Sequence, residues 1–385
     1  MAFPAVQGYN DFMVKRKRIY LDFAAGVSGN PSSPHEEGRA AKELLEEART
    51  SVARTLEVKA DDIIFTSGAT EANALAILGV ARAARVKEVV VPHLLYVPTA
   101  HASVVENMRL LAAEGFAVEE LPVLHGLVDT KALVSMIRSE TVLVSMDAVC
   151  GETGTIWNTR EVAKVLHDYR ALRGGAPWLH IDASQAVYTE KFTRAHFEAD
   201  LMTLDGGKLG VNGVGCLCVP RTIPLVPLYA GGGQERGLRS GTENVEGLAL
   251  FAEVLEVAFG AHEQFAQKAK KVRDTLVNHL ADIPRIYVYE APKQAPNILN
   301  LSFPGRDTDY LVALLDTAGF AVATRSACET DSEEGSRALF ALTGDTQNAK
   351  STLRVSWGPG ISEKKARLFV RALTEAVHFI DTTAL

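Results

Sequence analysis

The chain has 385 residues, of which 47% are hydrophobic and 23% charged, a balance typical of a globular protein with two or three domains. Its formal charge of −7 and its lack of a long apolar run lead us to expect neither nucleic acid nor a membrane as a partner. The N-terminus lacks the pattern of a signal peptide, and four cysteines are too few for a disulfide framework, so we expect a cytoplasmic protein.

Short β-branched runs alternate with amphipathic segments from about residue 60 onward. This alternation predicts an α/β fold with a mostly parallel sheet and helices on both of its faces. The expected strands are Ile63–Thr66, Glu88–Pro92, Thr141–Ala148, Trp178–Asp182, Asp200–Leu204 and Gly213–Val219, and the expected helices are Glu71–Ala84, Ala102–Glu114 and Thr159–Leu172.

The pattern changes after Gly241, where a long helical stretch, Glu243–Leu280, begins. We therefore expect an N-terminal segment (1–19), a large domain (20–261) and a smaller C-terminal α/β domain (262–385). The elements expected in the smaller domain are the strands Arg285–Tyr289, Asn297–Phe303 and Thr352–Ser356 and a last helix, Glu363–Ile380.

The segment Ser67–Glu71 follows a predicted strand and opens a predicted helix. The N-terminus of a helix can bind an anion, because its first backbone N–H groups are unpaired and the helix dipole is positive there. Gly68 and Ala69 would let a phosphate approach the backbone, and the hydroxyl of Thr70 could add a hydrogen bond. A helix start without a ligand is the alternative for this segment taken alone.

Asp182 and Lys208 each follow or end a buried strand, at the edge where open α/β sheets bind ligands. A buried carboxylate needs a cationic or N–H partner, and the protonated ring nitrogen of pyridoxal 5′-phosphate (PLP) would serve. A desolvated lysine amine can form a Schiff base with an aldehyde cofactor. The alternatives are a helix cap at Asp182 and a surface charge at Lys208.

Three cysteines and one arginine remain as candidates for a chemical role. Cys328 lies in a polar, acidic, loop-like segment, Thr324–Gly335, where a thiol could approach a substrate and withdraw. Cys216 and Cys218 alternate with apolar residues, which predicts that both side chains are buried in the core. A metal site is not expected there, because no further cluster of potential ligands lies beside them. Arg354 interrupts an apolar strand and could hold a substrate carboxylate or form a structural salt bridge.

Together these segments resemble, in order and over nearly the whole chain, the NifS/IscS-like cysteine desulfurases of the class V aminotransferase family. The most specific match is residues 231–245, GGGQERGLRSGTENV. The other matching segments are 20–24 (YLDFA), 29–33 (GNPSS), 67–71 (SGATE), 100–104 (AHASV), 151–154 (GETG), 180–183 (HIDA), 205–210 (DGGKLG), 297–305 (NILNLSFPG) and 326–328 (SAC).

The resemblance implies a homodimeric fold-type I PLP enzyme with a mostly parallel seven-stranded sheet and a small domain that carries the Cys328 loop. Lys208 would form the internal aldimine with PLP and shuttle protons. The other expected cofactor contacts are His101 stacked on the ring, Asp182 on the ring nitrogen, Gln185 on the phenolic oxygen, and Ala69, Thr70 and Thr242 of the other subunit on the phosphate.

The resemblance also implies the reaction, which converts L-cysteine to L-alanine. Arg354 would hold the carboxylate of L-cysteine, assisted by Asn30. The thiolate of Cys328 would attack the substrate sulfur and retain it as a persulfide, which then passes to an acceptor protein.

This sequence departs from the family pattern near the cofactor. The family has Ser-x-His before the lysine, whereas this chain has Asp205 and Gly207, and a carboxylate beside a phosphate is repulsive unless it points away. Cys150 stands where the family has an asparagine, and the segment between Ala25 and Gly29 is shorter than usual. Two alternatives therefore stay open: another class V activity, such as selenocysteine lyase or aminotransferase, and a degenerate dimeric scaffold.

Overall fold

The computed structural model describes residues 19–27, 29–86, 91–324 and 335–383. Cys328, the expected thiol, therefore lies outside the described residues. Within those four ranges, no helix combines the length and the apolar character needed to cross a membrane.

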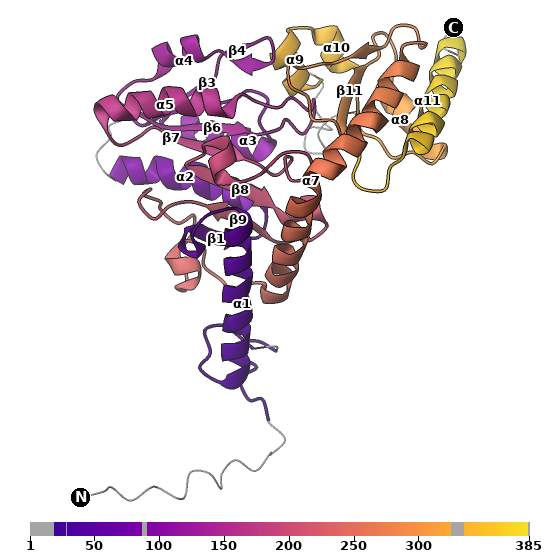
Figure 1. Ribbon diagram of the computed structural model, residues 1–385. Helices are drawn as coiled ribbons and strands as arrows, with labels where there is room; N and C mark the ends of the chain where they lie inside the picture. Colours follow the sequence, from indigo (N-terminus) through magenta and orange to yellow (C-terminus); the bar gives the residue numbers. More distant parts are fainter. Residues whose placement is uncertain (1–18, 28, 87–90, 325–334, 384–385) are drawn as a thin grey trace, which may run out of the picture.

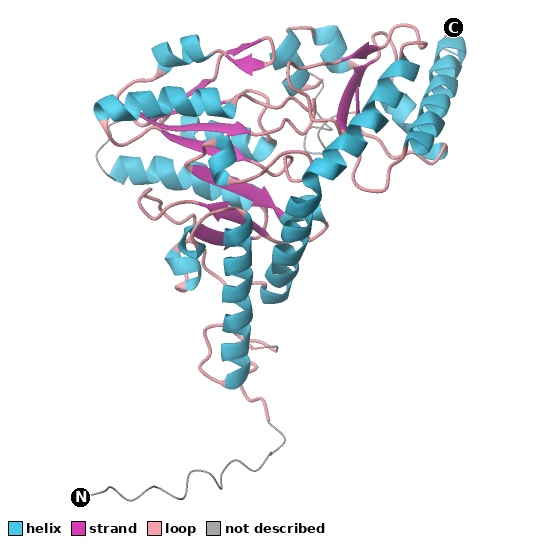
Figure 2. Ribbon diagram, in the orientation of Figure 1, coloured by secondary structure: helices cyan, strands magenta, loops and turns pink. Residues whose placement is uncertain are grey.

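A seven-stranded sheet forms the centre of the molecule and confirms the expected α/β architecture (Figure 2). Its strand order is β1-β9-β8-β7-β6-β2-β3, and β9 runs antiparallel to both of its neighbours while the other pairings are parallel. The strands are β1 (Ile63–Thr66), β2 (His93–Tyr96), β3 (Ala117–Glu120), β6 (Thr141–Asp147), β7 (Trp178–Asp182), β8 (Leu201–Asp205) and β9 (Gly215–Cys218).

The helices of this part are α1 (Glu36–Thr55), α2 (Ala69–Val86), α3 (Ala102–Ala113), α4 (Thr130–Met136), α5 (Thr159–Arg173) and α6 (Arg194–Phe197), and β4 (Val123–Leu124) pairs with β5 (Leu127–Val128). Helices cover this sheet because α2, α3 and α5 turn apolar stripes toward its strands. The interior strand β6 is buried along its whole length, although Thr141, Ser145 and Asp147 interrupt its apolar residues. Cys216 and Cys218 are buried in β9, which confirms their expected place in the core.

The strand predicted at Glu88–Pro92 falls mostly outside the described residues, and its described end, Val91 and Pro92, is not in a strand. Residues 87–90 lie outside the described ranges, and the observed strand β2 begins only at His93, after a proline that has no N–H to donate to a sheet. His93 looks like a strand breaker in the sequence, but Nδ1 of its buried ring lies 2.9 Å from the hydroxyl of Thr141, and its Nε2 lies 3.3 Å from the carboxylate of Glu119. The strand therefore contains a polar residue whose partner lies on the neighbouring strand β6, a contact that the apolar pattern of the sequence does not reveal.

A second, smaller hydrophobic core lies beyond the large sheet. The helix α7 (Val245–Leu280) joins the two, because its first half packs in the main core and its second half in the smaller one. The expected boundary at residue 262 falls inside this continuous helix and stays a prediction. The other elements of this part are β10 (Tyr287–Val288), β11 (Ile298–Ser302), β12 (Thr352–Ser356), α8 (Thr308–Thr317), α9 (Arg337–Thr343), α10 (Thr346–Lys350) and α11 (Glu363–Thr383).

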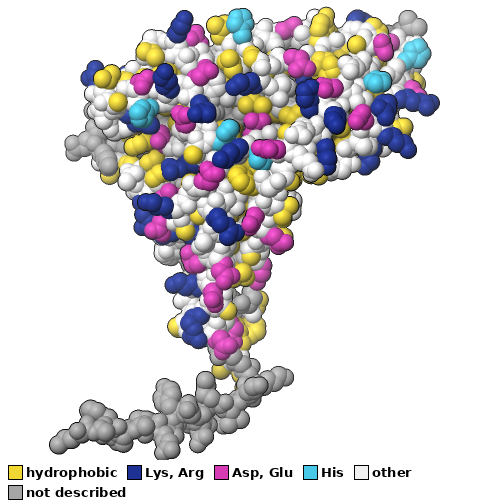
Figure 3. Space-filling model, in the orientation of Figure 1, with side chains coloured by type: hydrophobic (Ala, Val, Ile, Leu, Met, Phe, Trp, Pro, Cys, Tyr) yellow, Lys and Arg dark blue, Asp and Glu magenta, His cyan; other side chains and the backbone are white. Residues whose placement is uncertain are grey.

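The helix α1 projects from the body of the molecule, and the segment before it lies at its outer end (Figure 1). A helix of 20 residues is about 30 Å long, so this segment stands well away from the large sheet. Large apolar side chains at this outer end are exposed, among them Leu21 at 89%, Val27 at 76% and Phe23 at 68%. On the face shown in Figure 3, side chains of both charges are interspersed over the rest of the surface.

A buried ion pair ties α1 to the segment 231–245, the most specific sequence match. The guanidinium of Arg49 donates two hydrogen bonds to the carboxylate of Glu235, at 2.7 and 2.8 Å. Glu235 also accepts from the backbone N–H of Phe65 in β1, at 2.8 Å. One carboxylate therefore fixes a helix, a strand and a long connection relative to one another.

We expect Glu235→Gln to lower the free energy of unfolding by about 3–5 kcal/mol, because it removes the buried counter-charge of the Arg49 guanidinium and leaves only the exposed Glu46 as its ionic partner. Denaturant unfolding followed by circular dichroism measures this. Arg54→Gln, which breaks the exposed pair with Glu256, is the control and should cost no more than about 1 kcal/mol. Equal unfolding midpoints for both variants would show that the buried ion pair stabilises the protein no more than the exposed one.

Candidate active site

A cavity of about 440 Å³ opens at the carboxyl ends of β6, β7 and β8, beside the start of α2. This is the edge at which open α/β sheets bind ligands, and the volume is in the range of small-molecule sites. Among the residues that line it are several that the sequence predicts for the site: Ala69, Thr70, His101, Asp182, Gln185, Lys208 and Arg354.

Asp182 is held at the end of β7 by two donors. The amide of Asn73, on α2, donates to Oδ2 at 2.7 Å, and the backbone N–H of Ser184 donates to Oδ1 at 2.9 Å. The carboxylate is 7% exposed and lines the cavity, so its remaining hydrogen-bonding capacity is directed at a ligand there. This arrangement suits a ligand that carries an N–H group or a positive charge.

His101 joins the same network from the start of α3. Its Nδ1 accepts from the backbone N–H of Ser103 at 3.1 Å and lies 2.8 Å from the hydroxyl of that residue. The Ser103 hydroxyl in turn accepts from Asn73 at 2.9 Å. Because Nδ1 is an acceptor, the neutral ring carries its proton on Nε2, and Ser103 and Asn73 link the ring to Asp182.

His180 supports Asp182 from inside the sheet. It precedes Asp182 by two residues, so the two side chains project from the same face of β7. Its ring is fully buried between Ser145 on β6, at 2.8 Å, and Thr203 on β8, at 3.0 Å. Burial lowers the pKa of His180 to about 4, so the ring is neutral and links three strands beneath the cavity.

Lys208 is carried into the cavity by a short 3-10 turn, Gly206–Leu209, that follows β8 directly. Gly206 is required here because a Cβ at this position would lie 2.7 Å from the carbonyl oxygen of Val211. Lys208 itself is exposed. The desolvated amine that the sequence suggests is therefore not provided by the protein around it, because a turn at the end of a strand lies at the surface.

Arg354 reaches the cavity from β12 in the smaller core. Its guanidinium donates to the backbone carbonyl of Gly151 at 3.4 Å, and it has no carboxylate partner among the described residues. The salt bridge that was the alternative is therefore not found within that part of the chain. Gln185 packs closely on the same Gly151, since a Cβ there would lie 2.8 Å from the Gln185 amide nitrogen.

The expected anion site lies at the start of α2, which begins at Ala69, two residues before the predicted start at Glu71. Gly68 has a φ of +151°, which favours glycine, and the turn is fixed by the Ser67 N–H donating to the carboxylate of Glu71 at 2.6 Å. The carboxylate of Asp205 lies at this helix start, with Oδ1 3.4 Å from the backbone nitrogen of Ala69. Asp205 therefore points toward the expected phosphate position and not away from it.

Asp147 is a cavity residue that the sequence reasoning missed. It ends β6 beside Asp182 on β7, and its Oδ1 is buried with no hydrogen-bond partner among the residues that the structure describes. Burial, with the neighbouring charge of Asp182 adding to it, raises the pKa of Asp147 to about 7. An acid at the end of a predicted buried strand was the available signal, and it is the same signal that identified Asp182.

Other cavity residues were missed for a different reason. Asn73 and Ser103 look like ordinary polar positions on amphipathic helices, and only the tertiary structure shows that they connect Asp182 with His101. Arg337 lines the cavity from the start of α9 and donates to the carbonyl oxygens of Pro98 and Ala100. Its role depends on a contact between segments far apart in the sequence.

The remaining expected residues do not join this cavity within one chain. Asn30 lies in the segment before α1, and Thr242 lines a separate cavity of about 60 Å³ with Phe65. Cys328 lies outside the described residues. Cys150 is buried near the cavity and, as a cysteine, cannot make the amide contact of the asparagine in the family pattern. Burial raises the pKa of its thiol to about 12, so little of it is thiolate. Among the described residues, no cluster of His, Cys, Asp or Glu could hold a metal ion.

Comparison with known proteins identifies the family that has this arrangement. The model of the class V aminotransferases matches residues 17–365. The chain belongs to the class V aminotransferase family. It is 34% identical to cysteine desulfurase IscS 1 of Archaeoglobus fulgidus over 334 residues, which are 86% of this chain and 85% of that protein.

Solved structures agree with this assignment. A NifS-like protein superimposes with a TM-score of 0.83 at 30% identity, covering 93% of each chain. SspA in complex with cysteine gives a TM-score of 0.69 at 28% identity, covering 86% of this chain and 91% of the other. The chain therefore has the α/β fold of fold-type I PLP enzymes, as its sequence predicts.

We expect Asp147→Asn to stabilise the protein increasingly as the pH rises. The folded-state pKa of about 7 lies above the ordinary value of 3.8, so this carboxyl costs the folded protein free energy as pH rises through that interval. Between about pH 5 and pH 8, the free energy of unfolding of Asp147→Asn should gain roughly 2–3 kcal/mol relative to the unsubstituted chain. Denaturant unfolding over that range measures it.

The surface variant Asp274→Asn is the control, because its carboxylate pairs with Lys270 on an exposed helix face. Its difference from the unsubstituted chain should be nearly constant over the same pH range. A constant difference for Asp147→Asn as well would contradict the raised pKa.

Proposed function

We propose that this chain is a PLP-dependent cysteine desulfurase, which converts L-cysteine to L-alanine and transfers the sulfur through Cys328. The observation that carries the proposal is the convergence of Lys208, His101, Asp182 and Arg354 on one cavity from separate elements. Membership of the class V aminotransferase family and the similarity to a cysteine desulfurase support it. A cytoplasmic location belongs to the same proposal.

The ring end of the cavity fits PLP. Asp182 faces it with a carboxylate whose two oxygens are already fixed, and Lys208 is exposed to it for covalent attachment. Asp147 lines the same cavity, and its buried Oδ1 has no hydrogen-bond partner among the described residues. When bound, PLP supplies an electron sink that weakens the bonds at the α-carbon of an amino acid. The phosphate end is less suitable because of Asp205.

The residues of the chain have separable tasks in this reaction. Asp182, held by Asn73 and Ser184, would keep a proton on the ring nitrogen of the cofactor. His101 would present its Nε2 proton to the cavity, since its Nδ1 is engaged with Ser103. Lys208 would carry the cofactor and move a proton between atoms of the substrate.

Arg354 and Cys328 would act on the substrate itself. The guanidinium can hold the carboxylate of L-cysteine with two parallel hydrogen bonds. The thiolate of Cys328 would then attack the substrate sulfur, forming an S–S bond while the C–S bond breaks. The electron pair of that C–S bond stays with the carbon, which takes up a proton, so the products are L-alanine and a Cys328 persulfide. An acceptor protein would remove the persulfide sulfur.

A homodimer would complete this site. Thr242 and Asn30 lie outside the cavity of their own chain, although the family pattern assigns them to cofactor and substrate. The exposed apolar side chains at the outer end of α1 would be covered by a second copy. We therefore propose that both residues serve the cavity of the other subunit.

Lys208→Ala should lose the visible colour of bound PLP, and Cys328→Ser should keep that colour but lose at least about 100-fold in sulfide release from L-cysteine. Absorbance spectra and assays of sulfide and alanine measure both. Cys218→Ala is the matched thiol control and should stay active, since that thiol is buried in β9. Full sulfide release by Cys328→Ser would contradict the role of the thiol, and a colourless, inactive parent protein would favour the scaffold alternative.

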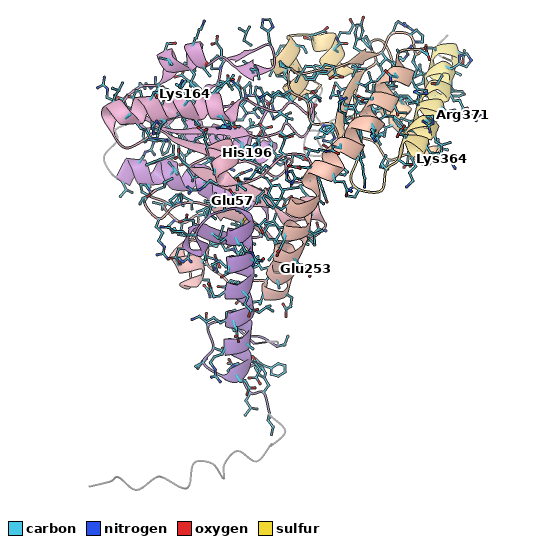
Figure 4. The ribbon with its side chains drawn as sticks, viewed as in Figure 1. Glu57, Lys164, His196, Glu253, Lys364 and Arg371 are labelled. Carbon is cyan, nitrogen blue, oxygen red and sulfur yellow. The ribbon has the colours of Figure 1, made fainter. Side chains whose placement is uncertain are left out.

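Arg354→Gln should raise KM for L-cysteine by roughly 10–100-fold and change kcat less, because the lost contact holds the substrate before and during the reaction. Steady-state kinetics with saturating PLP separates the two constants. Arg371→Gln is the control: this side chain is 79% exposed and points outward from α11 in Figure 4. An unchanged KM for Arg354→Gln would remove this residue from the substrate site.

A further inference from the structure

The carboxylate of Asp205 lies at the start of α2, on the line of approach for the cofactor phosphate. Its Oδ1 is 3.4 Å from the backbone nitrogen of Ala69. The same oxygen would lie 3.4 Å from a Cβ built on Gly68. Asp205 thus packs against both residues of the turn whose small size would admit a phosphate.

Within the described part of the chain, no cationic side chain pairs with this carboxylate. None of the described Lys, Arg or His residues forms an ion pair with Asp205, although Lys208 lies only three positions along the chain. The positive end of the 18-residue helix α2 is therefore its main electrostatic partner. A phosphate brought to the same N–H groups would meet this negative charge without an intervening cation.

Gly207 is adapted to this position of Asp205. A Cβ at residue 207 would lie 3.2 Å from Oδ2 of Asp205 and 3.4 Å from Oδ1 of Asn212. A side chain at this position would require the Asp205 carboxylate to shift by a few tenths of an ångström. Gly207 lets the carboxylate keep its position at the helix start without that shift.

We infer that Asp205 is an internal anion that occupies the phosphate position of the cofactor site and sets the affinity of the chain for phosphorylated ligands. This inference rests on the proposed PLP function. It makes Asp205 a specificity-determining residue: the carboxylate opposes PLP, whereas it leaves the binding of pyridoxal, which has no phosphate, unaffected. PLP binding then requires Asp205 to leave the helix start.

The test compares PLP and pyridoxal binding to the full chain after the cofactor has been removed. Asp205→Ser and Asp205→Asn should each bind PLP about tenfold or more tightly than the unsubstituted chain, because both remove the charge. Their affinity for pyridoxal should change by less than about twofold, because no second anion is present. Absorbance titration gives both dissociation constants. Unchanged PLP affinity in both variants would overturn the inference.

Inorganic phosphate provides a second measurement that does not depend on Lys208. Millimolar phosphate should raise the melting temperature of Asp205→Ser but not that of the unsubstituted chain. Equal phosphate stabilisation of the two would overturn the inference. Asp307→Ser is the matched control, because Asp307 caps α8 by accepting from the Tyr310 N–H at 3.0 Å. It should lose stability as a cap variant does, with no change in the effect of phosphate or PLP.

The two proposals fail in different ways. If neither PLP nor pyridoxal binds at Lys208 in any of these proteins, the proposed function fails, while the phosphate measurement still decides the role of Asp205. If the unsubstituted chain binds PLP as tightly as Asp205→Asn and desulfurates L-cysteine, the function stands and the inference about Asp205 falls.

Discussion

Three neighbouring strands of the large sheet end in aspartate, and the rest of the site depends on how these carboxylates are held. Asp147, Asp182 and Asp205 end β6, β7 and β8 and face one cavity. Burying a carboxylate costs several kcal/mol unless it is hydrogen-bonded, paired or protonated. Each of the three meets that constraint differently, and the differences assign their roles.

Two hydrogen-bond donors stabilise the Asp182 carboxylate. Asp147 has a raised pKa, so its carboxyl group is protonated more readily, and Asp205 lies at the positive end of a helix dipole. The helix α2 supplies two of these partners, since Asn73 holds Asp182 and the N-terminal turn holds Asp205. The position of α2 is in turn secured by the sheet and by the turn at Ser67–Glu71. One helix thus sets the geometry of the ring end and of the phosphate end of the cavity together.

Much of this could be predicted from the sequence, because periodicity and strand-end position are local properties. The predicted strands at Trp178–Asp182 and Thr352–Ser356 match the structure residue for residue, and the predicted site residues on them line the cavity. The start of β2 at His93 was not predicted, because this buried polar residue interrupts the apolar pattern. Asn73, Ser103 and Arg337 could not be predicted, because their partners come from distant segments. The direction in which Asp205 points also required the structure.

The central claim is that this cavity binds PLP through Lys208. The most direct test is to incubate the purified chain with PLP, reduce it with borohydride and map the modified residue by peptide mass spectrometry. The account predicts a phosphopyridoxyl group on the peptide that contains Lys208. Modification of a different lysine, or no modification at saturating PLP, would contradict it.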